Sequence, residues 1–458
     1  MARDDGEPRA VRAAPPIEWV VRVPGSKSLT NRALVLAAMA RGVTGIELAL
    51  RSADTDALAS ALRSLGAGVE SVEPSYEPPL RHGGFRVAGV GGEFPSGPDV
   101  SLNLGDGGTP TRFMLAAAAF ARRRVTINGS ARMRERPVAD GVRLLRDLGV
   151  DVAWAEGAER LPVVVNGQGG PPAGGELRVG ALASSQFVSA LLLLAPWMRD
   201  GLEVRFDEPP VSRSYLDLTV DELRRWGASV DESVDSFGSL RSIRVSPGPL
   251  AARPSHLIEP DASSALYWAA AAAIVPGSDV VLDGLSVSSR QPDVLAIEQL
   301  GRHGATVIGG GADLRVCCRA RAGDRSAPIS GMRADLERCP DGALMLIAAA
   351  AVAGGSSRFD GLGTLRVKES DRLEAMAEGL RRVGAGARIG DAWIEVDPIP
   401  AGHAVDAEID PHDDHRVAMS FAVLGLRTGG IRIANPGCVA KSYPQFWLAL
   451  ERCEQGGR

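Results

Sequence analysis

Two helical patterns alternate along the chain, and each recurs about once every 80 residues. The first is amphipathic: apolar residues recur at helical spacing, and the stripe ends at a glycine of the kind that follows a helix. Five such stripes end at Gly66, Gly149, Gly227, Gly304 and Gly384. These glycines are 83, 78, 77 and 80 residues apart, and a sixth helix is predicted at 444–452.

The second pattern is a helix rich in Ala and Leu with almost no polar face. Such a helix is apolar on nearly all sides and belongs in the centre of a domain. A turn and a β-branched strand follow each one. The predicted buried helices are 29–40, 109–121, 185–195, 263–274, 342–352 and 415–426, and the strands are 44–48, 125–128, 202–206, 279–282, 356–359 and 430–433.

Together the patterns predict six βαβαβ units, each with one buried and one amphipathic helix. Six units in 458 residues exceed what one hydrophobic core holds. We therefore expect an α/β protein of two pseudo-symmetric domains with three units each. A linker is expected within 247–260, which is rich in Pro, Arg and Ser.

Small or polar residues precede every buried helix and suit N-terminal caps. The N-terminus of a helix carries a partial positive charge and binds anions. If three such helices open at one surface of each domain, two facing surfaces enclose a cleft for a phosphorylated ligand. The first of these turns, Pro24–Ser28, is not a Walker loop, because Ser26 and not glycine precedes Lys27.

Composition excludes several classes of partner. The net charge is −5, so no basic field favours nucleic acid or an anionic membrane. The longest apolar runs, such as 343–353, are shorter than the roughly 18 residues of a membrane span, and residues 1–16 lack the apolar core of a signal peptide. The five cysteines form no CxxC pair, which indicates a reducing, cytoplasmic location.

Lysine is rare in this chain. Of 51 basic residues, only Lys27, Lys368 and Lys441 are lysines. These three are candidates for positions that need a compact ammonium group rather than a planar guanidinium.

All three lysines fall within an ordered series of motifs that runs from about residue 20 to residue 450. The motifs are Pro24–Ser28 with Asn31-Arg32, Leu104–Thr109 with Arg112, Arg134–Pro137, Ser184–Phe187, Asp261–Ser264, Arg366–Arg372, Asp414–Met419 and Ala440-Lys441. In these motifs the chain resembles the 5-enolpyruvylshikimate-3-phosphate (EPSP) synthase family of enolpyruvyl transferases.

The resemblance implies two domains, each an inside-out α/β barrel of three βαβαββ repeats. The first domain would span 25–257, and the second 258–458 with an N-terminal strand from 1–24. It also implies transfer of the enolpyruvyl group of phosphoenolpyruvate to the 5-hydroxyl of shikimate 3-phosphate, with release of phosphate by addition–elimination. No cofactor or metal is expected, and the chain is expected to be a monomer.

The resemblance also assigns substrate-binding residues. Those expected to bind phosphoenolpyruvate are Lys27, Gly108, Arg136, Gln186, Arg372, Arg416 and Lys441. Those expected to bind shikimate 3-phosphate are Lys27, Ser28, Arg32, Ser184, Ser185, Gln186, Ser212, Tyr215, Asp341 and Lys368.

The reaction needs acid–base groups beside these cations. Asp341 is the candidate base for the hydroxyl, assisted by Lys368, although an aspartate at a helix start is also an ordinary N-cap. Glu369 is the candidate that protonates and deprotonates the methylene carbon, and the alternative is an exposed glutamate in a run of charges. Lys27 is expected to belong to the catalytic set as well.

Two residues depart from the family pattern. Asp106 stands where a neutral Asn is common, and a carboxylate beside a phosphate repels it unless it is protonated or turned away. Thr364 replaces a common Asn and is therefore left out of the expected site.

Three other interpretations remain open. Residues 412–415, His-Asp-Asp-His, also suit a zinc or manganese ion. A UDP-N-acetylglucosamine enolpyruvyl transferase shares fold and donor, but typically carries a reactive cysteine in its first domain, and here every cysteine follows residue 316. The third interpretation is a non-catalytic protein that binds a phosphorylated ligand.

Overall fold

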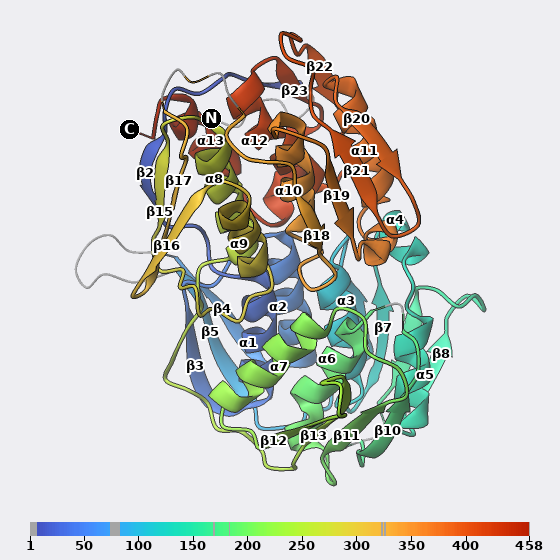
Figure 1. Ribbon diagram of the computed structural model, residues 1–458. Helices are drawn as coiled ribbons and strands as arrows, with labels where there is room; N and C mark the ends of the chain where they lie inside the picture. Colours follow the sequence, from blue (N-terminus) through green and yellow to red (C-terminus); the bar gives the residue numbers. More distant parts are fainter. Residues whose placement is uncertain are drawn as a thin grey trace. The chain divides into compact units, whose positions relative to one another are not determined.

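The chain folds into two units, one of which is discontinuous in sequence (Figure 1). The computed structural model describes residues 7–73, 83–167, 170–182, 184–321, 324 and 327–457. The first unit is Gly25–Glu259, and the second unit is Met1–Pro24 together with Pro260–Arg458. Each unit has its own hydrophobic core.

The three sheets of the first unit follow one plan. In each, one parallel pair of strands is extended by two antiparallel pairs, in the orders β14-β3-β5-β4, β6-β7-β9-β8 and β10-β11-β13-β12. The strands are β3 (Arg41–Glu47), β4 (Gly68–Val72), β5 (Gly84–Val90), β6 (Val100–Asn103), β7 (Arg124–Asn128), β8 (Asp151–Trp154), β9 (Val163–Asn166), β10 (Gly175–Val179), β11 (Leu202–Phe206), β12 (Val230–Val234), β13 (Leu240–Val245) and β14 (Ser255–Leu257).

Two sheets of the second unit repeat this plan, and the third has three strands with one parallel and one antiparallel pair. The sheets of this unit have the orders β16-β17-β15-β2, β18-β19-β21-β20 and β1-β23-β22, so β1 and β2 pair with strands of the C-terminal half. The strands are β1 (Arg9–Val11), β2 (Glu18–Val21), β15 (Asp279–Leu282), β16 (Thr306–Gly310), β17 (Asp313–Cys317), β18 (Arg333–Asp335), β19 (Ser357–Asp360), β20 (Gly386–Ile389), β21 (Ile394–Asp397), β22 (Ala407–Ile409) and β23 (Ile431–Ile433).

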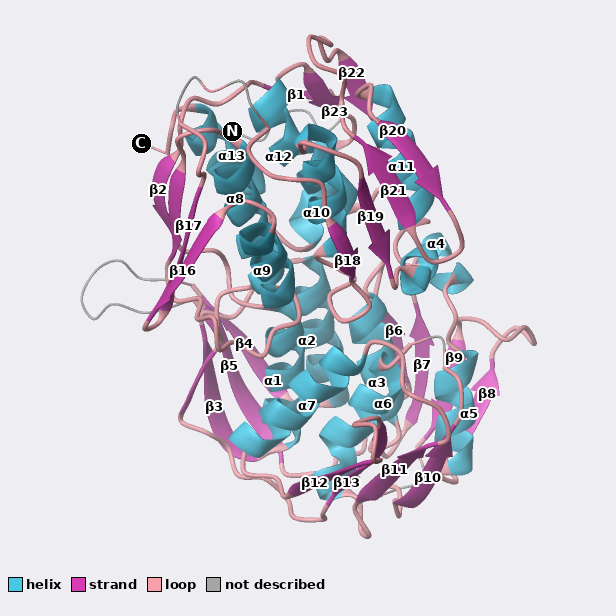
Figure 2. Ribbon diagram, viewed as in Figure 1, coloured by secondary structure: helices cyan, strands magenta, loops and turns pink. Residues whose placement is uncertain are grey.

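The six predicted buried helices are all present, and in each unit they lie inside the ring of sheets (Figure 2). This confirms the prediction of an inside-out α/β architecture. The helices are α1 (Lys27–Met39), α3 (Gly108–Ala118), α6 (Gln186–Leu194) continued by η1 (Ala195–Trp197), α8 (Ala262–Ile274), α10 (Ala343–Ala349) continued by η2 (Ala350–Val352), and α12 (His415–Thr428). In α8, the residues from Ala269 to Ala273 have no exposed surface, because only small side chains let neighbouring elements pack so closely.

The amphipathic helices also follow the predicted pattern. They are α2 (Ala53–Leu65), α5 (Ala139–Asp147), α7 (Arg213–Arg225), α9 (Val294–Arg302), α11 (Arg372–Arg382) and α13 (Phe446–Glu454). The five glycines predicted to end them all have positive φ angles, between 78° and 130°. Within the described residues, no helix has both the length and the apolar character needed to span a membrane.

The predicted linker is wrong in part. Residues 255–257 form β14, which pairs in parallel with β3 and completes the first sheet of the first unit. A segment rich in Pro and Arg favours irregular structure. A three-residue strand such as β14 is stabilised mainly by the neighbouring strand, so its own residues show no clear alternation of apolar and polar positions.

An aromatic cluster joins the two ends of the chain in the second unit. Trp268 of α8 stacks on Phe446 of α13 with ring centroids 5.5 Å apart, and meets Trp19 of β2 edge to face, also at 5.5 Å. Its indole N–H donates to the hydroxyl of Tyr443 at 3.2 Å. Aromatic pairs of this kind add stability beyond the area they bury, so they hold β2 firmly in this unit.

Candidate active site

Three aspartates stand at the starts of the buried helices in the second unit. Asp261 and Asp414 are N-caps of α8 and α12, and each carboxylate accepts a hydrogen bond from a backbone amide of its own helix, at 2.7 and 2.9 Å. Asp341 directly precedes Gly342, the N-cap of α10, and its carboxylate contacts side-chain cations.

The carboxylate of Asp341 lies among three cations. Its Oδ1 is 3.0 Å from Nη1 of Arg372 and 3.6 Å from Nζ of Lys368, and its Oδ2 is 3.1 Å from Nη2 of Arg416. Burial alone would raise the pKa of Asp341, but Arg416, Lys368 and Arg372 outweigh it and hold this pKa well below the usual aspartate range. Asp341 is therefore ionised and available to accept a proton, beyond any role in capping.

Arg372, the first residue of α11, joins this aspartate to two further carboxylates. Its Nε is 2.7 Å from Oδ2 of Asp414, and its Nη2 is 3.0 Å from Oε2 of Glu369. Arg372 is 1% exposed and Asp414 has no exposed surface. Burial lowers the pKa of Arg372, but Asp414, Glu369 and Asp341 outweigh burial and raise it above its ordinary value.

The other oxygen of Glu369 faces the last lysine of the chain. Oε1 is 3.2 Å from Nζ of Lys441, the final residue of the short helix η4 (Pro436–Lys441). Lys368 and Glu369 themselves follow η3 (Gly363–Val367). We call the seven residues Asp341, Lys368, Glu369, Arg372, Asp414, Arg416 and Lys441 the Asp341 cluster. Four cations and three carboxylates leave it one net positive charge, which suits an anionic ligand.

In the first unit, two guanidinium groups surround the start of α3. Nη1 of Arg112 donates to the carbonyl of Gly108 at 3.1 Å, and its guanidinium lies over the ring of Phe187. Arg136, which follows the short helix α4 (Ala131–Glu135), approaches so closely that a Cβ on Gly108 would lie 2.6 Å from its Nη1. Only glycine leaves room for both guanidinium groups here.

The first lysine of the chain is held by an aspartate. Lys27 is the first residue of α1, and its Nζ lies 3.3 Å from Oδ2 of Asp54, in the first turn of α2. Ser26 is the N-cap of α1, but its side chain makes no capping hydrogen bond.

Five of the residues expected to bind shikimate 3-phosphate lie at the starts of α6 and α7, namely Ser184, Ser185, Gln186, Ser212 and Tyr215. The hydroxyl of Ser185 donates to the carbonyl of Ser212 at 3.4 Å, and the backbone N–H of Gln186 donates to the hydroxyl of Ser184 at 3.3 Å. The amide of Gln186 also donates to the hydroxyl of Thr109 at 3.2 Å, which links this group to the start of α3.

Arg32 is buried behind this group. It donates to the carbonyls of Ser28 and Tyr215, at 2.9 and 3.0 Å, and to the hydroxyl of Thr219 at 2.9 Å. Burial lowers the pKa of Arg32 to about 10, and the charge of Glu222 opposes this shift. These hydrogen bonds make Arg32 a support for the backbone at Ser28 and Tyr215.

Unusual backbone conformations gather beside the same residues. Four of the five non-glycine residues with positive φ in the described part of the chain are Ser212, His412, Asp413 and Asn435. Ser212 is itself an expected ligand, His412 and Asp413 lead into Asp414, and Asn435 is the N-cap of the helix that ends at Lys441. Strain of this kind is typical of functional sites.

The two departures from the family pattern behave differently. The carboxylate of Asp106 is turned toward the hydroxyl of Ser130, the N-cap of α4, and accepts a hydrogen bond from it. Asp106 thus has a structural partner of its own. Thr364 lies half-buried in η3.

The residues of the possible metal site point to different partners. His412 Nε2 lies 3.3 Å from Glu378, the carboxylate of Asp413 accepts from the amide of Asn435, and Asp414 bonds to Arg372. Among the described residues, no group of three or more His, Cys, Asp or Glu side chains is arranged to hold a metal ion.

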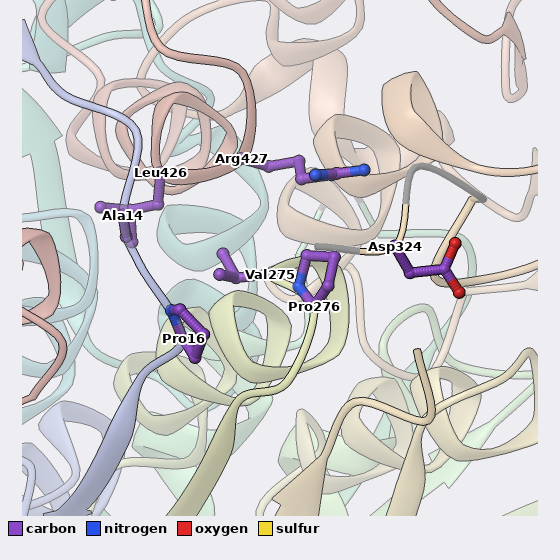
Figure 3. A pocket seen from close by; sticks show the side chains of 7 residues that line it. All are labelled: Ala14, Pro16, Val275, Pro276, Asp324, Leu426 and Arg427. Atoms are coloured by element: carbon purple, nitrogen blue, oxygen red, sulfur yellow. The ribbon is translucent and has the colours of Figure 1, made fainter. Parts of the chain in front are cut away.

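A cavity of about 240 Å³ lies at the C-terminal ends of α8 and α12 in the second unit (Figure 3). Arg416, in the first turn of α12, and Arg427, in its last turn, are separated by about 16 Å at 1.5 Å per residue. The cavity is therefore separate from the Asp341 cluster. Its lining residues are Ala14, Pro16, Val275, Pro276, Asp324, Leu426 and Arg427.

Sequence reasoning missed three carboxylates that shape the site: Asp54, Asp414 and Asp293. Asp54 and Asp293 read as ordinary acidic residues at helix starts, and Asp414 was noted only as part of a motif. Asp293 is 2% exposed, and burial raises its pKa to about 6, with Arg416 lowering it and Asp341 raising it further. The roles of these three carboxylates become apparent only from the residues that the folded chain brings into contact with them.

The chain is similar to a known family over most of its length. Residues 11–450 match the family described as EPSP synthase (3-phosphoshikimate 1-carboxyvinyltransferase). A 3-phosphoshikimate 1-carboxyvinyltransferase of Methanoculleus marisnigri is 37% identical over 436 residues, covering 95% of this chain and 96% of that protein. One of Shewanella amazonensis is 35% identical, covering 94% and 95%. Among solved structures, EPSP synthase from Acinetobacter baumannii has a TM-score of 0.77 and 27% identity, covering 97% of this chain and 98% of that one.

Replacing Arg372 by Met tests the electrostatic support of the Asp341 cluster. Without the guanidinium, Asp414 is left buried and uncompensated, so we expect Arg372→Met to lower the free energy of unfolding by about 3–5 kcal/mol. Urea denaturation followed by tryptophan fluorescence measures this. Arg432→Met is the control, because it breaks an exposed pair with Asp406 and should cost less than about 1 kcal/mol. Equal losses in the two variants would contradict the prediction.

Asp293 gives the unfolding free energy a defined pH dependence. Because its pKa is raised from 3.8 to about 6, the native state keeps a proton that the unfolded chain releases, and stability from this group falls as the pH rises through that window. Asp293→Asn removes the titration. Relative to the native protein, its free energy of unfolding should rise by up to about 3 kcal/mol between pH 4 and pH 7. Parallel stability curves from urea denaturation at each pH would refute this.

Proposed function

We propose that the residues described above perform the reaction of the EPSP synthase family, to which the chain belongs. In this reaction the enolpyruvyl group of phosphoenolpyruvate is transferred to the 5-hydroxyl of shikimate 3-phosphate. The reaction belongs to the shikimate pathway of aromatic amino-acid biosynthesis. It releases phosphate. Relatives that are 34–37% identical to this chain carry the name of this transferase and not that of the UDP-sugar enzyme.

The chemistry makes three demands on the protein. The phosphates and carboxylates of both substrates must be neutralised. The 5-hydroxyl must lose a proton, and the methylene carbon of phosphoenolpyruvate must gain one and later return it. The first demand calls for cations, and the other two call for two acid–base groups held at fixed positions.

One observation carries the proposal: Arg372 holds Asp341 and Glu369 on one guanidinium. Both nitrogen–oxygen distances are 3.0 Å, so the two carboxylates are fixed relative to each other. A reaction that moves two protons at neighbouring atoms needs such a pair. In our proposal Asp341 takes the hydroxyl proton, assisted by Lys368, and Glu369 serves the methylene carbon.

The bond changes then balance in two stages. In the addition, the 5-oxygen bonds to the central carbon of phosphoenolpyruvate, its proton passes to Asp341, and Glu369 gives a proton to the methylene carbon. In the elimination, the bond from that carbon to the phosphate oxygen breaks, and the new methyl group returns its proton to Glu369. The enolpyruvyl double bond is restored, and phosphate leaves with the proton that Asp341 took from the hydroxyl, so both carboxyl groups return to their starting states.

Cations supply the remaining electrostatic stabilisation. We propose that Arg372, Arg416 and Lys441 of the second unit bind phosphoenolpyruvate, because planar guanidinium groups match its carboxylate in two-point contacts. The proposed ligands from the first unit are Lys27, Gly108, Arg136 and Gln186. The proposed ligands of shikimate 3-phosphate are Lys27, Ser28, Arg32, Ser184, Ser185, Gln186, Ser212, Tyr215, Asp341 and Lys368.

The proposal extends to the organisation of the protein. We propose that the protein has two domains, 25–257 and 258–458 with the strands of 1–24, which correspond to the two units except that the units divide after Glu259. We propose that it acts as a monomer, since one chain supplies every residue named here. A cytoplasmic location is supported by five cysteines that form no disulfide.

Phosphate release from phosphoenolpyruvate in the presence of shikimate 3-phosphate tests the proposed roles. Glu369→Gln keeps the size of the side chain but removes its acid–base function, so kcat should fall by roughly 10²–10⁴ while the Kd of shikimate 3-phosphate changes little. Glu378→Gln is the control, because Glu378 lies on the following helix, α11, and pairs with Arg382; its kcat should stay unchanged. A Glu369→Gln enzyme with more than a tenth of the normal kcat would remove Glu369 from this role.

Gly108→Ala tests the assignment of Arg136 to phosphoenolpyruvate. The added Cβ would lie 2.6 Å from Nη1 of Arg136 and 2.9 Å from Nη1 of Arg112, so both must move. The KM for phosphoenolpyruvate should rise about tenfold, equivalent to about 1.4 kcal/mol, while the KM for shikimate 3-phosphate changes less than threefold. Gly248→Ala, where an added Cβ meets nothing within 4 Å, is the control and should have normal constants. Equal changes in both KM values would count against the assignment.

A further inference from the structure

A buried carboxylate lies behind the Asp341 cluster, where three helices of the second unit begin. Asp293 is the N-cap of α9. Its Oδ1 accepts a hydrogen bond from the backbone N–H of Gly342, at the start of α10, at 3.0 Å. Its Oδ2 accepts a hydrogen bond from the hydroxyl of Ser263, in the first turn of α8. One side chain therefore ties α8, α9 and α10 together.

The hydrogen bond to Gly342 acts on the residue next to the proposed base. Gly342 is closely packed: a Cβ there would lie 2.9 Å from Ala296, 3.0 Å from Leu266 and 3.1 Å from Oδ1 of Asp293. The backbone after Asp341 is thus held from three sides. A shift of Asp293 moves that backbone, and with it the carboxylate of Asp341.

A second route runs through Ser263. The hydroxyl that donates to Asp293 also accepts a hydrogen bond from Nη2 of Arg416 at 3.4 Å. The same Nη2 is 3.1 Å from Oδ2 of Asp341. Asp293 therefore acts on Asp341 by two routes: through the adjacent backbone at Gly342, and through Ser263 and Arg416.

The other two helix starts of this unit show why such a group is needed. Asp261 and Asp414 cap their own helices with their own carboxylates. At α10 the N-cap is Gly342, which has no side chain, and the carboxylate of the preceding aspartate contacts Lys368, Arg372 and Arg416. Asp293 instead accepts a hydrogen bond from the N–H of Gly342 itself, which also donates to the carbonyl of Cys339, while the carboxylate of Asp341 faces the cations.

We propose that Asp293 is a positioning residue for enolpyruvyl transfer: through the hydrogen bonds that it accepts from Gly342 and Ser263, it holds the carboxylate of Asp341 and the guanidinium of Arg416 in their working positions. This inference rests on the proposed role of Asp341 as the base. Asp293 itself touches neither substrate.

The charges around Asp293 make its proposed role depend on pH, which a purely structural role would not. The groups that face it are Arg416 from α12, Asp341 and Cys339 from the segment before α10, and Asp261 from α8. Burial raises the pKa of Asp293 to about 6; the charges of Asp341 and Asp261 raise it further, and the charge of Arg416 opposes them. The carboxylate therefore accepts the hydrogen bond from Gly342 as an anion at neutral pH and as a neutral acid below about pH 6. The neutral form accepts this hydrogen bond less strongly.

Steady-state kinetics of Asp293→Ala and Asp293→Asn test the proposal. We expect Asp293→Ala to lower kcat per folded molecule at least tenfold, with both KM values within about threefold. Asp293→Asn keeps an acceptor for Gly342 and should recover most of this loss. The ratio of native to Asp293→Asn kcat cancels the titration of the substrate phosphates, and it should fall from about three at pH 7.5 toward one at pH 5.5.

Three results would overturn the inference: a normal kcat in Asp293→Ala, a kcat in Asp293→Asn as low as in the Ala variant, or a ratio that does not change with pH. If the Ala variant fails to fold, the Asn variant and its pH ratio still decide the question. Asp283→Ala, at an exposed pair with Arg22, is the control and should behave as the native protein.

Asp341→Asn separates this inference from the proposed function. If Asp341→Asn loses turnover while Asp293→Ala keeps it, only the positioning role fails. If Asp341→Asn keeps normal turnover, the proposed base is wrong, whatever Asp293 does.

Discussion

The second unit depends on a buried guanidinium. Arg372 contacts carboxylates from three segments that are far apart in the chain, namely Asp341, Glu369 and Asp414. A guanidinium remains charged in proteins, so this group cannot avoid the cost of burial by releasing a proton. Its three acidic partners must therefore stay in place, and that requirement fixes the starts of α11 and α12 and the approach to α10. Proton transfer becomes possible because the charges that stabilise the fold also hold the acid–base groups.

Much of the fold follows from periodicity. The Ala- and Leu-rich helices and the glycines at intervals of 77 to 83 residues predict six similar units, and the structure contains them. What periodicity cannot predict is pairing between distant segments. The strand β14 is too short to leave a pattern, and its stability comes from β3. For the same reason a stretch expected to be a linker proved to be part of a sheet.

The site was predictable to a similar extent. The scarcity of lysine drew attention to Lys368 and Lys441, and the structure brings both to carboxylates of the Asp341 cluster. Asp54 and Asp293 could not be found in this way, because an acidic residue at a helix start is common and its sequence gives no sign of a distant partner. Charge pairs of this kind form through space, and only the packing of the helices decides which carboxylate meets which cation.

The pairing of β2 with β15 also sets an order of events during synthesis. Val21 lies opposite Leu282, and Arg9 lies opposite Ile433, so the first strands leave the ribosome long before their partners exist. At 5–20 residues per second the wait for β15 alone is on the order of tens of seconds. Gly25–Glu259 can complete all three of its sheets in that interval. The strands β1 and β2 are thus among the last parts to find their place, and until then Trp19 and Val21 lack the partners that bury them in the folded protein.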